Sequence, residues 1–284
     1  MVSICAASAH QNECSCMSAL EPRIWPRNTA LSHTESMTFG GVDVKDLARD
    51  YGTPLFVVDE LDVRSRAREF VDAFNFEDLN CTIHYASKAF SSADVLRWVS
   101  AEGLGVDVST GGELGLALAA GIPARTIVLH GNNKSVSELQ RGIEAGIGAI
   151  VIDSFDEIER LAQLTRLTSK SVDVFLRLTL GVEAHTHEFI ATAHEDQKFG
   201  LSVNSGAAEQ AALAVLAVPG LRLRGFHSHI GSQIFDPAGF EAAAERAINF
   251  IAHMLREHEF VTEHLDLGGG LGLSLIHISE PTRH

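Results

Sequence analysis

The feature that most constrains the fold is an alternation of short apolar runs with helical patterns along most of the chain. Seven runs have the length and composition of buried parallel strands: 82–85, 105–108, 126–129, 149–152, 173–178, 223–226 and 264–267. Amphipathic helical patterns separate them, for example at 93–101, 112–120, 135–145 and 155–164. The first four runs recur about every 22 residues, which is the length of one strand, one helix and two loops.

Strand–helix alternation on this scale predicts an α/β fold with a parallel sheet. Seven strands favour a (β/α)₈ TIM barrel over a doubly wound sheet, which stays open as the alternative. An eighth strand is expected to follow the seventh. In front of the repeat, 44–51 predicts a short helix and 55–58 a strand.

Composition excludes several classes of protein. The net charge of −15 over 284 residues argues against nucleic-acid binding, which needs clustered Lys and Arg. No apolar stretch approaches the roughly 18 residues of a membrane span. Cys5, Cys14, Cys16 and Cys81 form no disulfide framework, and no signal peptide precedes them, so a cytoplasmic location is expected.

The unusual residues follow the predicted strands directly, where the active sites of barrels lie. They include Ser87-Lys88, Ser109-Thr110-Gly111-Gly112, His130-Gly131, Asp153-Ser154, His227-Ser228-His229 and Gly268-Gly269-Gly270. Loops of this kind are polar in any barrel, which explains most of these residues. It does not explain a lysine, two histidines and three consecutive glycines each directly after an apolar strand.

Lys88 is the first candidate for chemistry. A lysine just past a buried strand is expected to be partly desolvated, which lowers the pKa of its amine and makes it a nucleophile. Its segment, His84-Tyr85-Ala86-Ser87-Lys88-Ala89, closely resembles the cofactor-lysine strand of the alanine-racemase-like, fold-type III pyridoxal-phosphate enzymes. The resemblance implies that Lys88 carries pyridoxal 5'-phosphate and is the catalytic lysine.

Two further motifs extend the resemblance. Backbone N–H groups of the run Gly268-Gly269-Gly270 can wrap a phosphate, and Leu273 excludes a dinucleotide fingerprint. The run resembles the phosphate loop of that family. The resemblance also implies that His229 packs against the pyridine ring and that Ser232 touches the phosphate; a pair of core histidines at 227 and 229 is the structural alternative.

Among fold-type III enzymes, the chain most resembles the meso-diaminopimelate decarboxylases, through His130-Gly131-Asn132-Asn133-Lys134-Ser135, residues 181–187 and residues 194–200. That resemblance implies decarboxylation of meso-2,6-diaminopimelate to L-lysine and CO₂. The alternatives are another decarboxylase or racemase on the same barrel, or a non-catalytic relative. By the same likeness, Asp107 and Arg177 lie on the cofactor side, although either could be a structural ion-pair partner.

The histidines at 185, 187 and 194 lie near acidic residues but lack zinc-hydrolase spacing, because Ala191 stands where H-E-x-x-H needs its second histidine. We interpret the segment as a long polar active-site loop and expect no metal site.

We predict three regions: an irregular leader at 1–36, a pyridoxal-phosphate-binding barrel at 37–273, and a non-native-looking tail at 274–284. The resemblance implies that the family's chain continues into a last barrel strand, a Glu-Pro-Gly-Arg motif and a C-terminal β domain, and forms homodimers with shared active sites. We therefore expect an incomplete barrel that is inactive alone.

Overall fold

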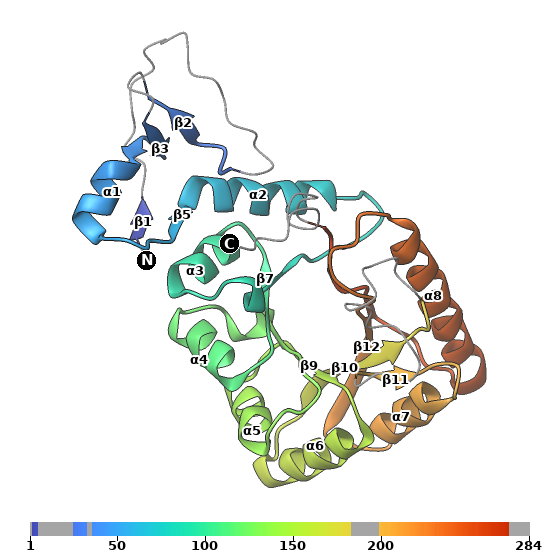
Figure 1. Cartoon of the computed structure of the whole chain (residues 1–284). Coiled ribbons are helices and arrows are strands. Elements are labelled where there is room, and N and C mark those ends of the chain that lie inside the picture. Colours follow the sequence, from blue (N-terminus) through green and yellow to red (C-terminus); the bar gives the residue numbers. More distant parts are fainter. Residues whose placement is uncertain (1, 5–24, 33–35, 183–198, 273–284) are drawn as a thin grey trace.

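The computed structural model describes residues 2–4, 25–32, 36–182 and 199–272. Seven strands of this part form one curled parallel sheet: β6 (His84–Ala86), β7 (Gly105–Val108), β8 (Ile127–Leu129), β9 (Ala149–Ile152), β10 (Val172–Thr179), β12 (Leu221–Ser228) and β13 (His264–Asp266). A two-residue strand, β11 (Leu201–Ser202), pairs with the end of β10. Figure 1 shows the strands curving around a centre with the helices outside them.

The order of the strands decides between the two predicted sheet types. Spatial neighbours follow the chain order from β6 to β13, with no reversal. A doubly wound sheet reverses its order at a switch point and carries helices on both faces. The barrel prediction is therefore confirmed. Within the described residues β6 and β13 are not hydrogen-bonded to each other, and the expected eighth strand does not occur.

Short hydroxyl side chains cap the first four of the outer helices. The outer helices are α3 (Ala93–Ala101), α4 (Gly111–Ala119), α5 (Val136–Ala145), α6 (Phe155–Thr168), α7 (Ala207–Leu216) and α8 (Ala238–His258). Ser92, Thr110, Ser135 and Ser154 each accept a hydrogen bond from a backbone N–H in the first turn of the helix that follows. Each cap ends a βα loop abruptly and keeps it short at the rim.

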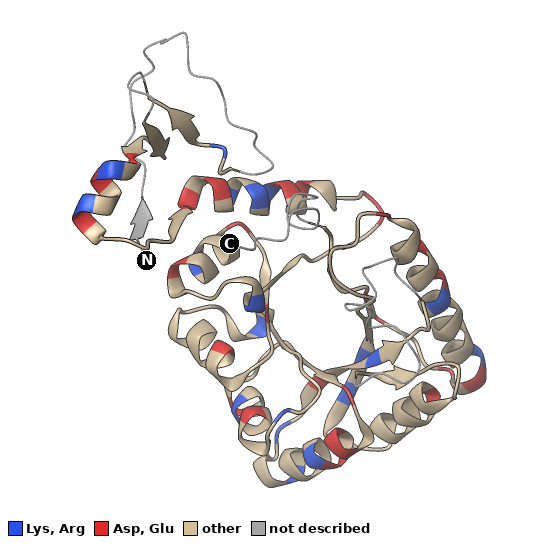
Figure 2. Cartoon of the chain, viewed as in Figure 1, with Lys and Arg blue, Asp and Glu red and all other residues tan. Residues whose placement is uncertain are grey.

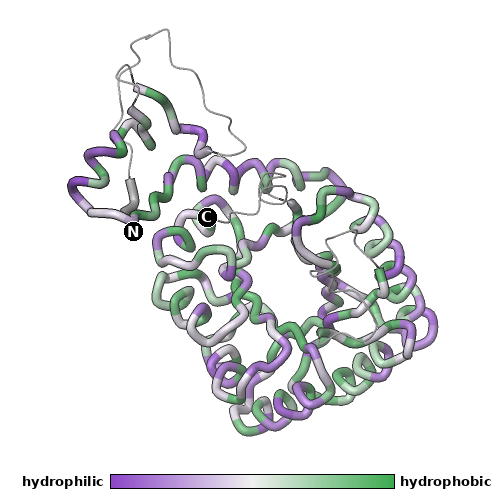
Figure 3. Tube along the Cα trace, in the orientation of Figure 1, coloured by the Kyte–Doolittle hydropathy of each residue, from purple (hydrophilic) through white to green (hydrophobic). Residues whose placement is uncertain are grey.

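The core lies between the sheet and these helices. In β10, Val172, Val174, Leu176 and Leu178 are buried in it, and the alternate residues, including Arg177, point to the interior of the curled sheet. Figure 3 shows hydrophobic residues along the strands and hydrophilic ones spaced along the outer helices. The outer face of the sheet is therefore the packed face, and the inner face is available for chemistry.

The N-terminal part is more ordered than predicted. β2 (Thr29–Leu31), β3 (Met37–Phe39) and β4 (Val42–Asp43) form an antiparallel sheet ahead of α1 (Val44–Tyr51). β1 (Val2–Ile4) pairs in parallel with β5 (Val57–Asp59). Two of these strands, β1 and β2, lie within the predicted leader 1–36. Strands of three residues are too short to show a periodic pattern in the sequence. Residues 5–24 and 33–35 lie outside the described part.

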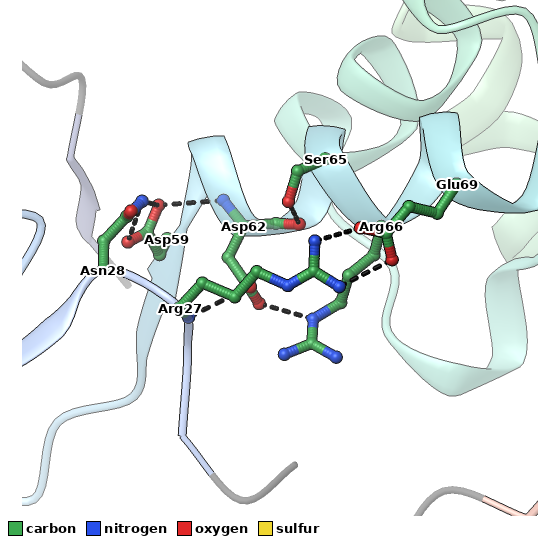
Figure 4. A network of polar contacts seen from close by, with 7 residues as sticks. All are labelled: Arg27, Asn28, Asp59, Asp62, Ser65, Arg66 and Glu69. Atoms are coloured by element: carbon green, nitrogen blue, oxygen red, sulfur yellow. Dashed lines mark hydrogen bonds and ion pairs between the residues drawn. The ribbon is translucent and has the colours of Figure 1, made fainter. Parts of the chain in front are cut away.

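A polar network fastens this part to α2 (Glu60–Ala73), as Figure 4 shows. Asp59 caps α2 by accepting the Asp62 N–H at 3.1 Å, and it also accepts from Asn28 Nδ2 at 3.1 Å. The Asp62 carboxylate in turn accepts from the Arg27 backbone N–H at 3.1 Å and from Arg66 Nε at 2.8 Å. The segment before β2 is therefore held by the same carboxylates that begin α2.

Figure 2 shows charged residues along α1 and α2 as well as along the outer helices. Among the described helices, none combines the length and the apolar character required to cross a bilayer.

The ion pair between Lys134 and Glu157 is buried in the wall of the barrel. Lys134 follows β8 and is 3% exposed, and its Nζ lies 2.8 Å from Glu157 Oε1 in α6. The same Nζ donates to the carbonyl of Val151 at 2.7 Å, and Glu157 Oε2 accepts the N–H of Asp153 at 2.9 Å. The pair therefore joins the loop after β8 to the loop after β9.

We predict that Lys134→Met lowers the free energy of unfolding by about 3–5 kcal/mol, because it leaves the Glu157 carboxylate buried without its cation. Lys170→Met is the matched control, since Lys170 is exposed, and it should change stability by less than about 0.5 kcal/mol. Urea unfolding of both variants checks this. Equal losses of unfolding free energy in the two variants would contradict the role of the pair. The double variant Lys134→Met with Glu157→Gln should recover part of the stability lost in Lys134→Met.

Candidate active site

Histidines and carboxylates from β6, β7, β12, β13 and the loop after β8 meet inside the curled sheet. Asp107 Oδ1 lies 3.0 Å from His84 Nδ1 and 3.4 Å from His130 Nε2. The rings of His130 and His227 are edge-to-face with centroids 4.9 Å apart, and His227 Nδ1 lies 2.8 Å from Asp266 Oδ2. The chain of contacts thus runs across the interior from the first strand of the sheet to the last.

The charges of this group are mutually compensated. Burial alone would raise the pKa of Asp107, but hydrogen bonds and charge from His130 and His84 hold it well below its usual range. Burial acts likewise on Asp266, yet His227 lowers its pKa to about 2. Both carboxylates are therefore ionised at neutral pH, and each lies against an imidazole.

Two histidines respond to this environment in opposite directions. Burial would lower the pKa of His84, but the hydrogen bond and charge of Asp107, with the charge of Asp266, raise it overall. His229 has its pKa lowered to about 3, first by burial and then by the charges of Lys88 and Arg177. Its ring is therefore neutral across the physiological range.

Lys88 lies in the short 3₁₀ helix η1 (Ser87–Ala89), directly after β6. The residue is exposed, so the expected desolvation is not found; it lies at the rim, beyond the last residue of its strand, and not within the sheet. Its charge nevertheless acts on His229, which follows β12 near the opposite end of the sheet. The curl of the sheet is what brings these two residues to one region.

Arg177 forms the next part of the rim. Its Nε lies 3.8 Å from Asp153 Oδ1, and its guanidinium carbon lies 4.4 Å from the centre of the Phe199 ring. Arg177, Phe199, Ser228 and His229 all line one small cavity. Arg177 therefore has a structural ion-pair partner in Asp153, which is the alternative that the sequence left open. The Arg177 side chain also borders the cavity.

The glycine run packs against the segment after β12. A Cβ on Gly268 would lie 2.4 Å from the carbonyl oxygen of Ser228, and one on Gly270 would lie 1.9 Å from that of Gly231. Both glycines also have positive φ, of 71° and 103°. Gly269 differs, because a Cβ there would meet nothing within 4 Å. The loop therefore lies tightly against residues 228–232 and opens on free space at its middle residue.

The structure brings the predicted residues to one end of the barrel. Lys88, Asp107, Arg177, His229, Ser232 and the three glycines all lie at or just beyond the carboxyl ends of the parallel strands. Sequence reasoning placed His130, Asp153 and His227 directly after predicted strands without a specific role, and it gave no role to His84 or Asp266. The signal available for them was the period of two, which places alternate residues at a strand end on the inner face.

The histidine-rich segment predicted as an active-site loop and the tail at 274–284 lie outside the described residues.

Comparison with known proteins identifies the family. The model of the pyridoxal-dependent decarboxylases, for their pyridoxal binding domain, matches residues 60–283. The chain is 53% identical over 268 residues to a diaminopimelate decarboxylase of Mycobacterium tuberculosis strain H37Rv, covering 92% of this chain and 59% of that protein. It is 47% identical over 245 residues to the diaminopimelate decarboxylase of Bacillus subtilis, covering 86% and 56%.

Among solved structures, the diaminopimelate decarboxylase of M. jannaschii in complex with L-lysine superposes with a TM-score of 0.80 at 31% identity, covering 87% of this chain and 57% of that one. The chain thus spans a little under three fifths of the length of the relatives it matches. The part that it shares with them contains every strand of the curled sheet and the rim residues described above. The chain belongs to the pyridoxal-dependent decarboxylases and contains their pyridoxal binding domain.

Proposed function

We propose that the whole protein uses pyridoxal 5'-phosphate to decarboxylate meso-2,6-diaminopimelate to L-lysine and CO₂. The observation that carries the proposal is 53% identity, over 92% of this chain, to proteins named diaminopimelate decarboxylase. The L-lysine bound in the M. jannaschii relative is the product that this reaction would release. Residues 37–273 would form the barrel that holds the cofactor.

The residues at the rim fit a phosphate-bearing aromatic cofactor. Within the described residues, the N–H groups of Gly269 and Gly270 donate to no protein atom, and the space beside Gly269 is open. The hydroxyl of Ser228 is buried and has no hydrogen-bond partner there. Free backbone donors beside open space are the arrangement that binds phosphate. We therefore place the phosphate at Gly268, Gly269, Gly270 and Ser232.

Lys88 would hold the cofactor covalently through its amine. Its exposure at the rim leaves the amine accessible to a molecule that enters from solvent. The cofactor, when bound, withdraws the electrons of the bond that breaks at the substrate α-carbon. Lys88 would hold the cofactor until the substrate binds, and its Nζ would then be free to carry a proton.

His229 would pack its ring against the cofactor ring. The pKa of about 3 keeps this imidazole uncharged, so that it offers an apolar face without adding a positive charge beside Lys88 and Arg177. Asp107 would face the cofactor as a carboxylate held ionised by His84 and His130. Arg177, which contacts Asp153 and Phe199, would lie on the cofactor side.

The proposal includes two features of the whole protein that are implied by resemblance: a homodimer with shared active sites, and a cytoplasmic location. The free, exposed Cys81 is consistent with a reducing compartment.

The first prediction concerns Lys88. The complete gene product should show a visible absorbance band with pyridoxal phosphate, and borohydride should fix the cofactor to the peptide that contains Lys88, because reduction makes the lysine bond permanent. Lys88→Ala should abolish both signals, whereas Lys170→Ala, at another exposed lysine, should preserve them. A reduced cofactor adduct retained on Lys88→Ala protein would overturn the assignment.

The second prediction concerns the substrate. The complete gene product should release CO₂ from meso-diaminopimelate with a kcat/KM at least about a hundredfold above that for ornithine, arginine or lysine. These three lack the distal carboxylate, so a site built to pair with it is left with unpaired polar groups. Equal turnover of ornithine would replace the proposed substrate and leave the cofactor assignment standing.

The third prediction concerns His229. Since its pKa falls from 6.5 to about 3 on folding, the unfolded chain takes up the proton first, and stability is lost as pH falls from 6.5 towards 3. Between pH 7 and pH 5 this residue should account for about 2 kcal/mol of lost unfolding free energy. His229→Gln should therefore lose less stability over that range in urea titrations. An equal loss in both proteins would show that His229 is not held neutral.

A further inference from the structure

Two histidines and a glutamate converge on the outer surface of the barrel, between α7 and α8. Glu209 lies in the first turn of α7, His253 lies in α8, and His258 is the last residue of α8. Glu209 Oε1 lies 3.2 Å from His253 Nε2 and 2.6 Å from His258 Nε2. One donor atom from each residue lies within 4.8 Å of the other two. We propose that this cluster binds a divalent metal ion from the later first-row transition series, such as Zn²⁺.

The donor set is the one that zinc prefers. Two imidazole nitrogens and one carboxylate oxygen form a frequent three-residue zinc site. With bonds of about 2.0–2.2 Å, adjacent ligand atoms of a tetrahedral ion are roughly 3.3 Å apart. The 3.2 Å separation between Glu209 and His253 already matches this spacing. The 2.6 Å hydrogen bond between Glu209 and His258 would open by roughly 0.7 Å as an ion replaces its proton.

The histidine rings are oriented before any ion binds. The His253 ring stacks on Phe250, with an interplanar angle of 28°, and Phe250 packs edge-to-face on the fully buried Phe226. The ring of His258 stands edge-to-face to that of His253. Because each ring already rests against a neighbouring ring, part of its side-chain freedom is lost before a metal binds.

The electrostatic surroundings also favour a cation. The last carbonyls of α8 lie around His258 and carry the negative end of the helix dipole. The three side chains are about one-fifth to two-fifths exposed, which leaves the fourth coordination position open to water.

The competing explanation is a hydrogen-bonded cluster without metal, in which each imidazole donates to Glu209. It explains the two short contacts equally well. It differs in one respect: a hydrogen-bonded cluster needs protons on the nitrogens that a metal ion requires to be bare. Metal titration therefore separates the two explanations.

The experiment uses the complete gene product, purified without a histidine tag and freed of metal with a chelator. Calorimetric titration with Zn²⁺ should find one site per chain that weakens by more than about tenfold in Glu209→Gln, His253→Ala and His258→Ala. Co²⁺ should give the visible absorption of a tetrahedral site in the parent and not in these variants. Glu241→Gln, an exposed carboxylate in the first turn of α8, is the matched control and should bind like the parent.

Circular dichroism shows whether each variant is folded. A bound ion should raise the unfolding midpoint of the parent and of Glu241→Gln, and leave that of the other three variants unchanged. Absence of Zn²⁺ binding by the folded parent would overturn the proposal. Binding that all three variants retain would place the ion elsewhere, for example on the histidines of 183–198, and would overturn it as well. The cluster lies away from the rim, so the proposed decarboxylation can fail or succeed independently.

Discussion

The curl of a single parallel sheet is the constraint on which the candidate site depends. Parallel strands joined by helices place all their carboxyl ends at one rim. That rule alone would spread the site residues along a line, because Lys88 follows the first strand of the sheet and His229 follows the sixth. Because the sheet curls, these residues lie around a ring instead. The effect of the curl appears in the electrostatics of the described residues: besides Asp107, the charge of Asp266 on β13 contributes to the raised pKa of His84 on β6, although those strands share no hydrogen bond.

Once the rim is a ring, its charges must be balanced. Two inward carboxylates, Asp107 and Asp266, would be expensive to bury as ions without partners. Each is paired with imidazole, and the rings of His130 and His227 touch each other between them. The neutral His229 then adds no charge to a region that already holds Lys88 and Arg177. The polar interior is therefore one coupled unit, so a substitution at one member should shift the pKa of several others.

The sequence predicted the repeating part of the fold well and the isolated contacts poorly. β7, β9 and α3 have the predicted bounds, because apolar runs and serine or threonine caps mark them locally. β2 and β11 have two or three residues and no period, so only their partners define them. The motif residues at the rim were found through resemblance, whereas His84 and Asp266 become site residues only when the sheet curls. The cluster of His253, His258 and Glu209 was missed because two histidines five residues apart match no helical metal motif.

The glycine run separates what packing requires from what a ligand requires. At Gly268 and Gly270 a side chain would collide with backbone carbonyls after β12, and the positive φ angles exclude most other residues in any case. Those two glycines are therefore explained by the fold itself. Gly269 is not, since a Cβ there would enter open space. A bound phosphate beside its N–H group would occupy that space, and a glycine in the middle of the run is then explained by the proposed cofactor and not by packing.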